Sequence, residues 1–303
     1  MEYAYYPGCS LEHTGQPYDS SIRSIFKALG VGLREIEDWN CCGATMYMSS
    51  KKTVGYALSA RNLALAAAQG LQVCAPCSSC YTILRKTNRH MRHDPANMER
   101  INTALAAAGM SYQADVKVRH PLDILVNDIG IETIGTASVK KLDGFKVAPY
   151  YGCQVVRPHK DFDDINEPTT LDDLLRRLGA EVVDYPSKVR CCGGMLMMTS
   201  NEVALDLNYH LMKCAEASGA NIIATACPLC QLNLEAYQKD VNKRHGDSLQ
   251  FPVVYFSQLV GLALGLSHEE LGLDQLLVPL DKMQTGDAPC GPCGSEKVKA
   301  GAS

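Results

Sequence analysis

Two sets of cysteines with nearly the same spacing dominate the sequence. The first set is Cys9, Cys41, Cys42, Cys77 and Cys80, and the second is Cys153, Cys191, Cys192, Cys227 and Cys230. In each set an adjacent pair precedes a glycine, and 35 positions separate that pair's second cysteine from a Cys-x-x-Cys turn. Thiolates select zinc, copper(I) or iron–sulfur clusters. Because zinc and a cubane cluster each take four ligands, five sulfurs per set indicate an iron–sulfur cluster, with a spare cysteine or a less regular shape.

Disulfide bonds are the competing explanation for so many cysteines. Disulfide frameworks are typical of short secreted chains. This chain has 303 residues, and Met1 leads almost directly into an apolar stretch and Cys9, without a signal-peptide pattern. Adjacent cysteine pairs and Cys-x-x-Cys turns also favour metal ligands. We therefore expect thiolate ligands in a reducing compartment and a cytoplasmic location.

Composition and charge argue against several other classes of protein. The formal net charge is −4 and the sequence pI is near 6.1. No block of five or six like charges occurs, which argues against nucleic acid or an anionic membrane surface as the main partner. The apolar run near Leu259–Leu266 is far shorter than the roughly 18 residues that a spanning helix needs. We expect no membrane span.

The elements that position the cysteines alternate between strands and helices. In the first copy we predict strands at 2–6, 31–36, 71–75 and 116–118, and helices at 18–29, 50–69, from the Cys77 turn toward His90, at 98–108, and from His120-Pro121. In the second copy we predict strands at 146–151, 180–185, 221–225 and 252–256, and helices at 171–178, from a capping box at Thr199–Glu202 to Gly219, from Pro228, and at 257–264.

This alternation predicts an α/β fold of two tandem domains related by a pseudo-twofold axis, each with a small parallel sheet. Ligand-binding loops follow the carboxyl ends of the strands in such sheets. Every cysteine turn of both sets comes just after a predicted strand, so the two sets become two spatial clusters. We expect domains at residues 1–140 and 141–280 and a flexible tail at 281–303.

Other sulfur-containing residues surround the two sets. The four remaining cysteines are Cys74, Cys214, Cys290 and Cys293. The other copy has alanine at the positions of Cys74 and Cys214, so we expect buried, small apolar side chains there. The Cys290-Gly-Pro-Cys293 turn is interpreted as a tail feature, with zinc binding or thiol relay as the alternative. The methionines of Met46–Met48 and Met195–Met198 are expected in the core, with shielding of a cluster as the alternative.

The repeated pattern Cys…Cys-Cys-Gly…Cys-x-x-Cys resembles the cysteine-rich CCG domain in tandem. From about residue 3 to residue 265 the chain resembles the family of heterodisulfide reductase B subunits. Related iron–sulfur subunits of glycolate, lactate and glycerol-3-phosphate dehydrogenases usually carry ferredoxin-type CxxCxxCxxxCP motifs ahead of such domains. The sequence has none of these motifs, which favours a stand-alone B subunit.

The resemblance implies two noncubane 4Fe–4S clusters, each held by one five-cysteine set, with a small disulfide or dithiol substrate between them. Two one-electron clusters flanking a disulfide match the two electrons of its reduction. A catalytic role is expected for Cys9, Cys41, Cys42, Cys153, Cys191 and Cys192. The resemblance also implies two partners in the same complex, a ferredoxin-type C subunit and a flavoprotein A subunit. The sequence has no GxGxxG motif for a flavin, so we expect electrons to pass to or from a partner.

One position departs from the family pattern. Members that act on the coenzyme M–coenzyme B disulfide commonly have histidine after the cysteine of the second Tyr-Gly-Cys, and this chain has Gln154. Glutamine forms hydrogen bonds but does not act as an acid as an imidazolium does. His120 and His159 are candidate proton donors, with capping or surface roles as the alternative. Arg157 and Lys160 are candidates for steering an anionic substrate, or simply solvated charges.

A second interpretation stays open. The chain would then be a non-catalytic electron-transfer subunit of a dehydrogenase or aromatic-reductase complex, with zinc or an ordinary cluster in one of the two sets. Metal content distinguishes the two interpretations. About eight irons and eight sulfides per chain favour the first, and one zinc with one cluster favours the second.

Overall fold

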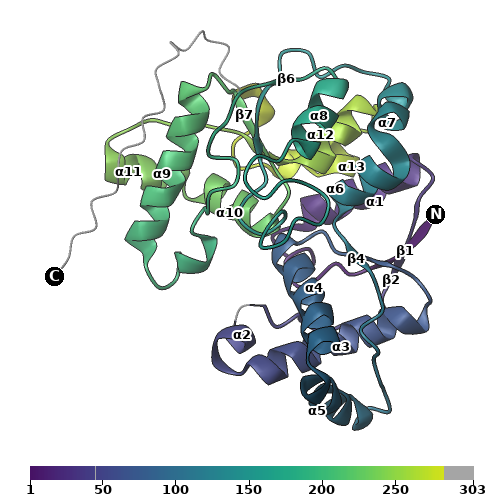
Figure 1. Cartoon of the computed structure of the whole chain (residues 1–303). Coiled ribbons are helices and arrows are strands. Elements are labelled where there is room, and N and C mark those ends of the chain that lie inside the picture. The colour runs from purple at the N-terminus through teal and green to yellow at the C-terminus, as the bar shows by residue number, and fades with distance from the viewer. Residues whose placement is uncertain (45, 283–303) are drawn as a thin grey trace, which may run out of the picture.

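The protein contains two four-stranded parallel sheets with helices packed around them (Figure 1). The computed structural model describes residues 1–44 and 46–282. The Cys290 and Cys293 turn and nearly all of the expected tail lie outside the described residues.

The first repeat runs from the N-terminus to residue 137. Its strands are β1 (Glu2–Tyr5), β2 (Gly32–Glu35), β3 (Val73–Cys74) and β4 (Val118–Arg119). Its helices are α1 (Gln16–Ala28), α2 (Met46–Ser50), α3 (Lys52–Ala68), α4 (Ser78–His93), α5 (Pro95–Ala106), α6 (Pro121–Asp123), a π-helical segment (Ile124–Gly130) and α7 (Ile131–Ala137).

The second repeat has the same order of main elements. Its strands are β5 (Lys146–Tyr150), β6 (Glu181–Val182), β7 (Ile222–Thr225) and β8 (Val253–Tyr255). Its helices are α8 (Thr170–Arg177), α9 (Asn201–Ala217), α10 (Pro228–Ala236), α11 (Gln238–His245), α12 (Phe256–Ala263) and α13 (His268–Leu271), with 3₁₀ turns at Gly194–Leu196, Leu273–Gln275 and Leu280–Lys282.

The two sheets have the same topology. Their strand orders are β2-β1-β3-β4 and β6-β5-β7-β8, and every neighbouring pair is parallel. In each sheet the chain steps outward in one direction to the second strand and in the other direction to the third. The strand order therefore reverses between β1 and β3, and between β5 and β7. The predicted fold of two tandem α/β repeats with parallel sheets is confirmed.

Local sequence explains most of the element boundaries. Helix α1 has Pro17 in its first turn, and the chain leaves it through Gly30 at φ +70°. Its apolar face, which includes Ile22 and Phe26, is fully buried. One boundary differs from the prediction: α9 begins at Asn201 after Ser200, without a side-chain cap, so the predicted capping box at Thr199 does not form. The 3₁₀ turn before α9 pulls Thr199 out of capping position.

The core is shared between the repeats. One continuous cluster of buried side chains includes Tyr18 and Phe26 of α1 together with Phe256 and Leu259 of α12. Figure 1 shows α1, α7, α8, α12 and α13 gathered in one part of the molecule, although they come from both repeats. A second cluster belongs to the second repeat and lies around β5, α9 and α11. The predicted boundary at residues 140 and 141 stays a prediction.

Candidate metal centre

The cysteine turns lie at the carboxyl edges of both sheets. The turn containing Cys9 follows β1 and the turn containing Cys77 follows β3, on either side of the point where the strand order reverses. Such a point opens a crevice at the carboxyl ends of the strands, where ligands bind. In the second repeat Cys153 follows β5 and Cys227 follows β7. The adjacent pairs of each set follow the outer strands β2 and β6.

Two sulfur pairs form hydrogen bonds, and electrostatic interactions link seven of the ten sulfurs in one row across both repeats. The Sγ atoms of Cys42 and Cys80 lie 3.3 Å apart, and those of Cys192 and Cys230 lie 3.5 Å apart. The row runs through Cys41, Cys42, Cys80, Cys77, Cys227, Cys230 and Cys192. The two sets therefore meet at Cys77 and Cys227. The Cys153 thiol is hydrogen-bonded to Cys191.

Equivalent glycines bring the backbone against the sulfurs. Gly8 has φ +72° and Gly152 has φ +71°, in the left-handed region that favours glycine. A Cβ at Gly8 would lie 3.1 Å from Cys80 Sγ, and one at Gly152 would lie 3.2 Å from Cys230 Sγ. Both repeats thus keep the same close approach between one strand end and the Cys-x-x-Cys turn of the next strand.

A set of hydrogen bonds ties the two Cys-x-x-Cys turns together. His120 is fully buried, and its Nε2 lies 3.0 Å from the Pro76 carbonyl oxygen and 3.1 Å from that of Ala226. These carbonyls precede Cys77 and Cys227. The Ser78 and Tyr18 hydroxyls also donate to the Ala226 oxygen, at 3.0 and 3.4 Å. First-repeat side chains thus hold the second repeat's turn in place.

The crowded thiols share protons. Hydrogen bonding with Cys41 and Cys80 lowers the pKa of Cys42 to about 4. A hydrogen bond from Cys153 lowers the pKa of Cys191 to about 6. Hydrogen bonding to Cys42 and Cys77 and burial raise the pKa of Cys80 well above its usual value. The neighbours of Cys42 and Cys191 keep their protons, because hydrogen bonding and burial raise the pKa of Cys41, Cys80 and Cys153 and because like charges in contact repel each other.

The sulfur ligands of each set fit a positively charged, thiophilic metal centre. Positive metal charge would let all sulfurs of a set ionise together, since a coordinating thiol loses its proton. The ten cysteines of the two sets form no disulfide. Among residues 1–44 and 46–282, no group of three or more His, Cys, Asp or Glu side chains is arranged to hold a single metal ion.

A small pocket lies between the two sets. Residues within three positions of a cysteine line it from both repeats, including Ala44, Ser79, Gln154 and Met195. The Gln154 carbonyl accepts a hydrogen bond of 2.9 Å from the Thr82 hydroxyl of α4. The residue that departs from the family pattern is therefore placed beside both cysteine sets.

The methionines near the sets do not all enter the core. Met195 is 49 % exposed and Met198 is 90 % exposed, whereas Met197 is buried. Met48 and Met195 line the pocket between the sets. Core packing was therefore the wrong expectation for Met195 and Met198. The glycine-rich Gly193-Gly194 turn places the following residues on the surface, before α9 begins.

The histidines and nearby cations take different roles. His120 caps α6 by accepting from the Leu122 N–H, and burial lowers its pKa to about 4, so it is a neutral capping residue. His159 is exposed and lines a separate cavity. Arg157 donates to the Ile165 carbonyl within its own loop, and Lys160 pairs with Asp164 at 3.2 Å. Neither cation lines the pocket between the sets.

The two described cysteines outside the sets are buried as expected. Cys74 is fully buried in β3 and Cys214 is buried in α9. Sequence reasoning missed the buried bridge from Tyr18 and Ser78 to Ala226, because spacing along the chain does not reveal contacts between repeats. It also missed a group of cations on α4. Their recurrence at helical spacing after the Cys-x-x-Cys turn, from Arg85 to Arg92, was a usable signal.

Comparison with known proteins identifies the repeats as cysteine-rich domains. The model of the CCG cysteine-rich domain matches residues 3–85 and 147–235, more than half of the chain. The matches cover the full set of five cysteines in each repeat.

Several curated relatives match over nearly their whole length. The 8-methylmenaquinol:fumarate reductase membrane anchor subunit of Wolinella succinogenes is 36 % identical, over 93 % of this chain and 99 % of the relative. A protein of Archaeoglobus profundus described as like the B subunit of heterodisulfide reductase is 31 % identical, over 89 % of this chain and 93 % of the relative. The B subunit of a ferredoxin:CoB-CoM heterodisulfide reductase of Methanosarcina mazei is 30 % identical, over 88 % of this chain and 91 % of the relative.

A solved structure supports the fold. A hypothetical protein from Helicobacter pylori superposes with a TM-score of 0.74 at 15 % identity, over 92 % of this chain and 52 % of that chain. This chain thus spans about half of that structure's length. Within the part of this chain that the structure describes, no helix has the length and apolar character needed to cross a bilayer.

The tandem cysteine-rich domains and the full-length similarity lead to one conclusion. Two of the relatives at 30 % identity or more are described as subunits of reductases, and a third is described as like such a subunit. The chain belongs to the tandem cysteine-rich domain family that includes the B subunits of heterodisulfide reductases.

Proposed function

We propose that this chain is the catalytic iron–sulfur subunit of a heterodisulfide reductase-like complex. It reduces a small disulfide to two thiols, or oxidises two thiols, between its two cysteine sets. Each set would hold one noncubane 4Fe–4S cluster through its five cysteines. A ferredoxin-type subunit and a flavoprotein subunit would exchange electrons with it.

One observation carries the proposal: the two sets meet at Cys77 and Cys227, and the pocket between them is lined from both repeats. Reduction of a disulfide consumes two electrons and two protons and releases two thiols. Clusters held by the two sets would supply one electron each to a bond in this pocket. A single set would leave the reaction half complete.

The side chains around the pocket have separate tasks in this reaction. Met48 and Met195 present thioether chains that exclude water from the pocket. Lys86 lines the same pocket and brings a positive charge that favours a thiolate product. Gln154 offers hydrogen bonds but no acidic proton. The two protons therefore come from solvent or from the partner complex.

The proposal is tested by separate Cys42→Ala and Cys192→Ala variants, purified anaerobically. Each variant should lose disulfide reduction with a reduced viologen dye while keeping the electron paramagnetic resonance signal of the intact set. The Cys74→Ala variant is the matched control, because the other repeat has Ala224 at the equivalent position and the change leaves both sets complete. Full turnover in both set variants would contradict the proposal.

The similarity to the fumarate reductase anchor subunit supports a second candidate function. The relative from Wolinella succinogenes is 36 % identical over nearly its full length. Enzymes that act on the coenzyme M–coenzyme B disulfide commonly have histidine where this chain has Gln154. This difference also favours a function without that disulfide as substrate. In this alternative the chain passes electrons within a fumarate reductase-like complex and has no disulfide substrate.

Purification of the native complex distinguishes the two candidates. Co-purification with a flavoprotein that reduces fumarate, together with no disulfide turnover by the isolated chain, supports the alternative. Disulfide turnover by the isolated chain with about eight irons per chain supports the first proposal.

A further inference from the structure

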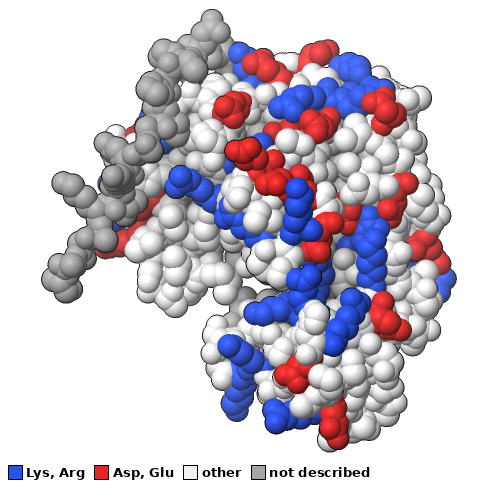
Figure 2. All heavy atoms as spheres, in the orientation of Figure 1, with Lys and Arg blue, Asp and Glu red and all other residues white. Residues whose placement is uncertain are grey.

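A cavity of about 750 Å³ lies beside the cysteine sets and is lined by both repeats. Helix α4, strand β4 with the residues just before it, and the segment from Pro158 to Phe162 each supply one wall. The volume falls within the range of pockets that bind small molecules. Figure 2 shows Lys and Arg side chains gathered around a hollow near the middle of the face on which α4 lies.

The cavity is strongly basic in a chain whose net charge is −4. Six Lys and Arg side chains line it against three Asp side chains. Arg119 is neutralised, because it pairs with Asp123 and, at 2.9 Å, with Asp128. Arg85 pairs with Asp161 of the opposite wall. These pairs account for every aspartate in the cavity.

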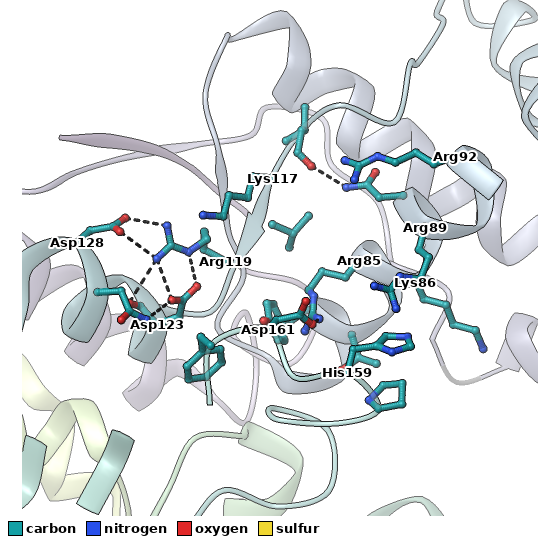
Figure 3. Close-up of a pocket in the computed structure, with 18 residues that line it drawn as sticks. Arg85, Lys86, Arg89, Arg92, Lys117, Arg119, Asp123, Asp128, His159 and Asp161 are labelled. Atoms are coloured by element: carbon teal, nitrogen blue, oxygen red, sulfur yellow. Dashed lines mark hydrogen bonds and ion pairs between the residues drawn. The ribbon is translucent and has the colours of Figure 1, made fainter. Parts of the chain in front are cut away.

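The other cations form no ion pair within residues 1–44 and 46–282. The side chains of Lys86, Arg89 and Lys117 form no hydrogen bond there, although Lys117 is near enough to Asp128 to lower the pKa of that carboxyl, and the Arg92 side chain donates only to the Ala114 carbonyl. Figure 3 shows Arg89 and Lys86 on α4 and Lys117 on the other side of the Arg85–Asp161 pair in this view. The unpaired charges therefore surround the cavity from two elements.

The spacing of these cations is unfavourable without an anion. On α4, Arg85 and Arg89 are four residues apart, and Arg89 is three residues from both Lys86 and Arg92. Like charges at these spacings destabilise a helix. The helix dipole favours cations in the last turn, which accounts for Arg92. It does not account for Arg85 and Lys86, which lie in the middle of α4.

The cavity adjoins the pocket between the cysteine sets. Thr82 and Lys86 line both spaces, and Thr82 is hydrogen-bonded to the Gln154 carbonyl. A molecule in the basic cavity would therefore reach the edge of the pocket beside Gln154.

We propose that the basic cavity between α4, β4 and residues 158–162 binds a small molecule that carries at least two negative charges, as phosphate or carboxylate groups. The ligand pairs with Arg89 and Lys86 on one wall and Lys117 on another. This site is separate from the cysteine ligands, and its occupation does not require the reaction proposed above.

The probe is inorganic pyrophosphate, titrated by calorimetry into the anaerobically purified full-length protein at constant ionic strength. We expect saturable binding at one site per chain. Arg89→Gln and Lys117→Gln should each weaken binding by about tenfold, because each removes one charged hydrogen bond to the ligand. The double variant should weaken it by about a hundredfold, since the two side chains come from different walls.

The matched control is Lys243→Gln, which removes one positive charge from an exposed lysine of α11, away from the cavity. This variant should bind pyrophosphate as tightly as the unmodified protein. Thermal unfolding confirms that the variants are folded, and the substituted side chains are exposed. Absence of saturable binding, or equal binding in the cavity variants and the control, would overturn the proposal.

The anionic ligand is either the substrate itself or a separate effector, and turnover measurements distinguish the two. Only these turnover measurements rest on the proposed disulfide chemistry. If the charges belong to the substrate, Arg89→Gln raises the KM of a dicarboxylate disulfide about tenfold and leaves that of bis(2-hydroxyethyl) disulfide unchanged. If they belong to a separate effector, pyrophosphate changes the rate with the neutral disulfide, and Arg89→Gln removes this response. Both results support the anion site. If neither disulfide reacts, the proposed function fails, and the calorimetric titration still decides whether the anion site exists.

Discussion

At the scale of single residues, His120 joins the two repeats through hydrogen bonds of its side chain. Its Nδ1 accepts from the Leu122 N–H, so Nε2 carries the proton and donates to the Pro76 and Ala226 carbonyls. One neutral imidazole thus fixes the backbone ahead of both Cys-x-x-Cys turns. The sequence made His120 a candidate proton donor, and its complete burial assigns it to positioning instead.

Replacing His120 by alanine should lower the free energy of unfolding by about 3 kcal/mol, because two buried carbonyls lose a donor and a cavity opens. Chemical denaturation measures the change. Ser78→Ala is the control, since it removes one donor to the Ala226 carbonyl and leaves His120 in place; its cost should be about 1 kcal/mol. Equal costs for the two variants would show that His120 does not bridge the turns.

Gly8 allows a test of the close approach between the backbone after β1 and the Cys80 sulfur. In Gly8→Ala, backbone strain at φ +72° adds to the contact between Cβ and Cys80 Sγ. Gly70→Ala is the matched control, because it has φ +67° and nothing within 4 Å of the added Cβ. Both variants should lose about 1 kcal/mol from strain alone. Only Gly8→Ala should also lower iron content, measured per chain after anaerobic purification; equal iron in both would contradict a role of this close approach in holding iron.

At the scale of elements, α10 contains a buried acid. Glu235 accepts hydrogen bonds from Gln231 at 2.6 Å and from the Val278 N–H at 3.3 Å. Burial raises its pKa from 4.5 to about 7. The folded chain therefore binds more protons than the unfolded chain between these pH values, so stability is greatest below pH 4.5 for this group and falls as pH rises toward 7.

The Glu235→Gln variant should remove this decline. Above pH 7 it should be more stable than the unmodified protein by about 3 kcal/mol, because it avoids a buried carboxylate. Unfolding free energies from about pH 5 to pH 8 measure the effect. The exposed Glu269 of α13 provides the control Glu269→Gln, which should keep the decline. A decline that persists in Glu235→Gln would assign it to another group.

The elements themselves were largely predictable, because alternating apolar strands and glycine-ended helices carry local signals. The predicted helices that became α1, α8 and α12 begin and end within about two residues of the structure. The π-helical segment from Ile124 to Gly130 was not predicted, since its sequence reads as an ordinary helix. Short strands such as β3 were predicted too long, because their ends form turns toward the cysteines.

At the scale of the whole molecule, the relative placement of the two cysteine sets was beyond the sequence. Matching spacing predicted two equivalent sites. It did not predict that they meet at Cys77 and Cys227, or that first-repeat side chains anchor the Ala226 carbonyl. Such contacts depend on side chains that pack between repeats, for which a single sequence has no periodic signal. The basic cavity could not be predicted from the sequence either, because its walls come from both repeats.

The shared core also predicts how the chain unfolds. Tyr18 of α1 stacks on Tyr255 with ring centroids 4.3 Å apart, and the buried Ser21 and Ser257 hydroxyls lie 2.7 Å apart. Cutting the chain at residue 140 would expose these surfaces to water, at a cost of about 25 cal/mol for each Å² of apolar area. We therefore expect residues 1–140 and 141–282, produced separately, to lack a cooperative thermal transition by circular dichroism, whereas the full chain melts in one step. Mixing the two pieces should restore the transition, because all the contacts of the shared core are then available. A cooperative transition in either piece alone, within about 5 °C of the full chain, would show that the repeats are independent domains.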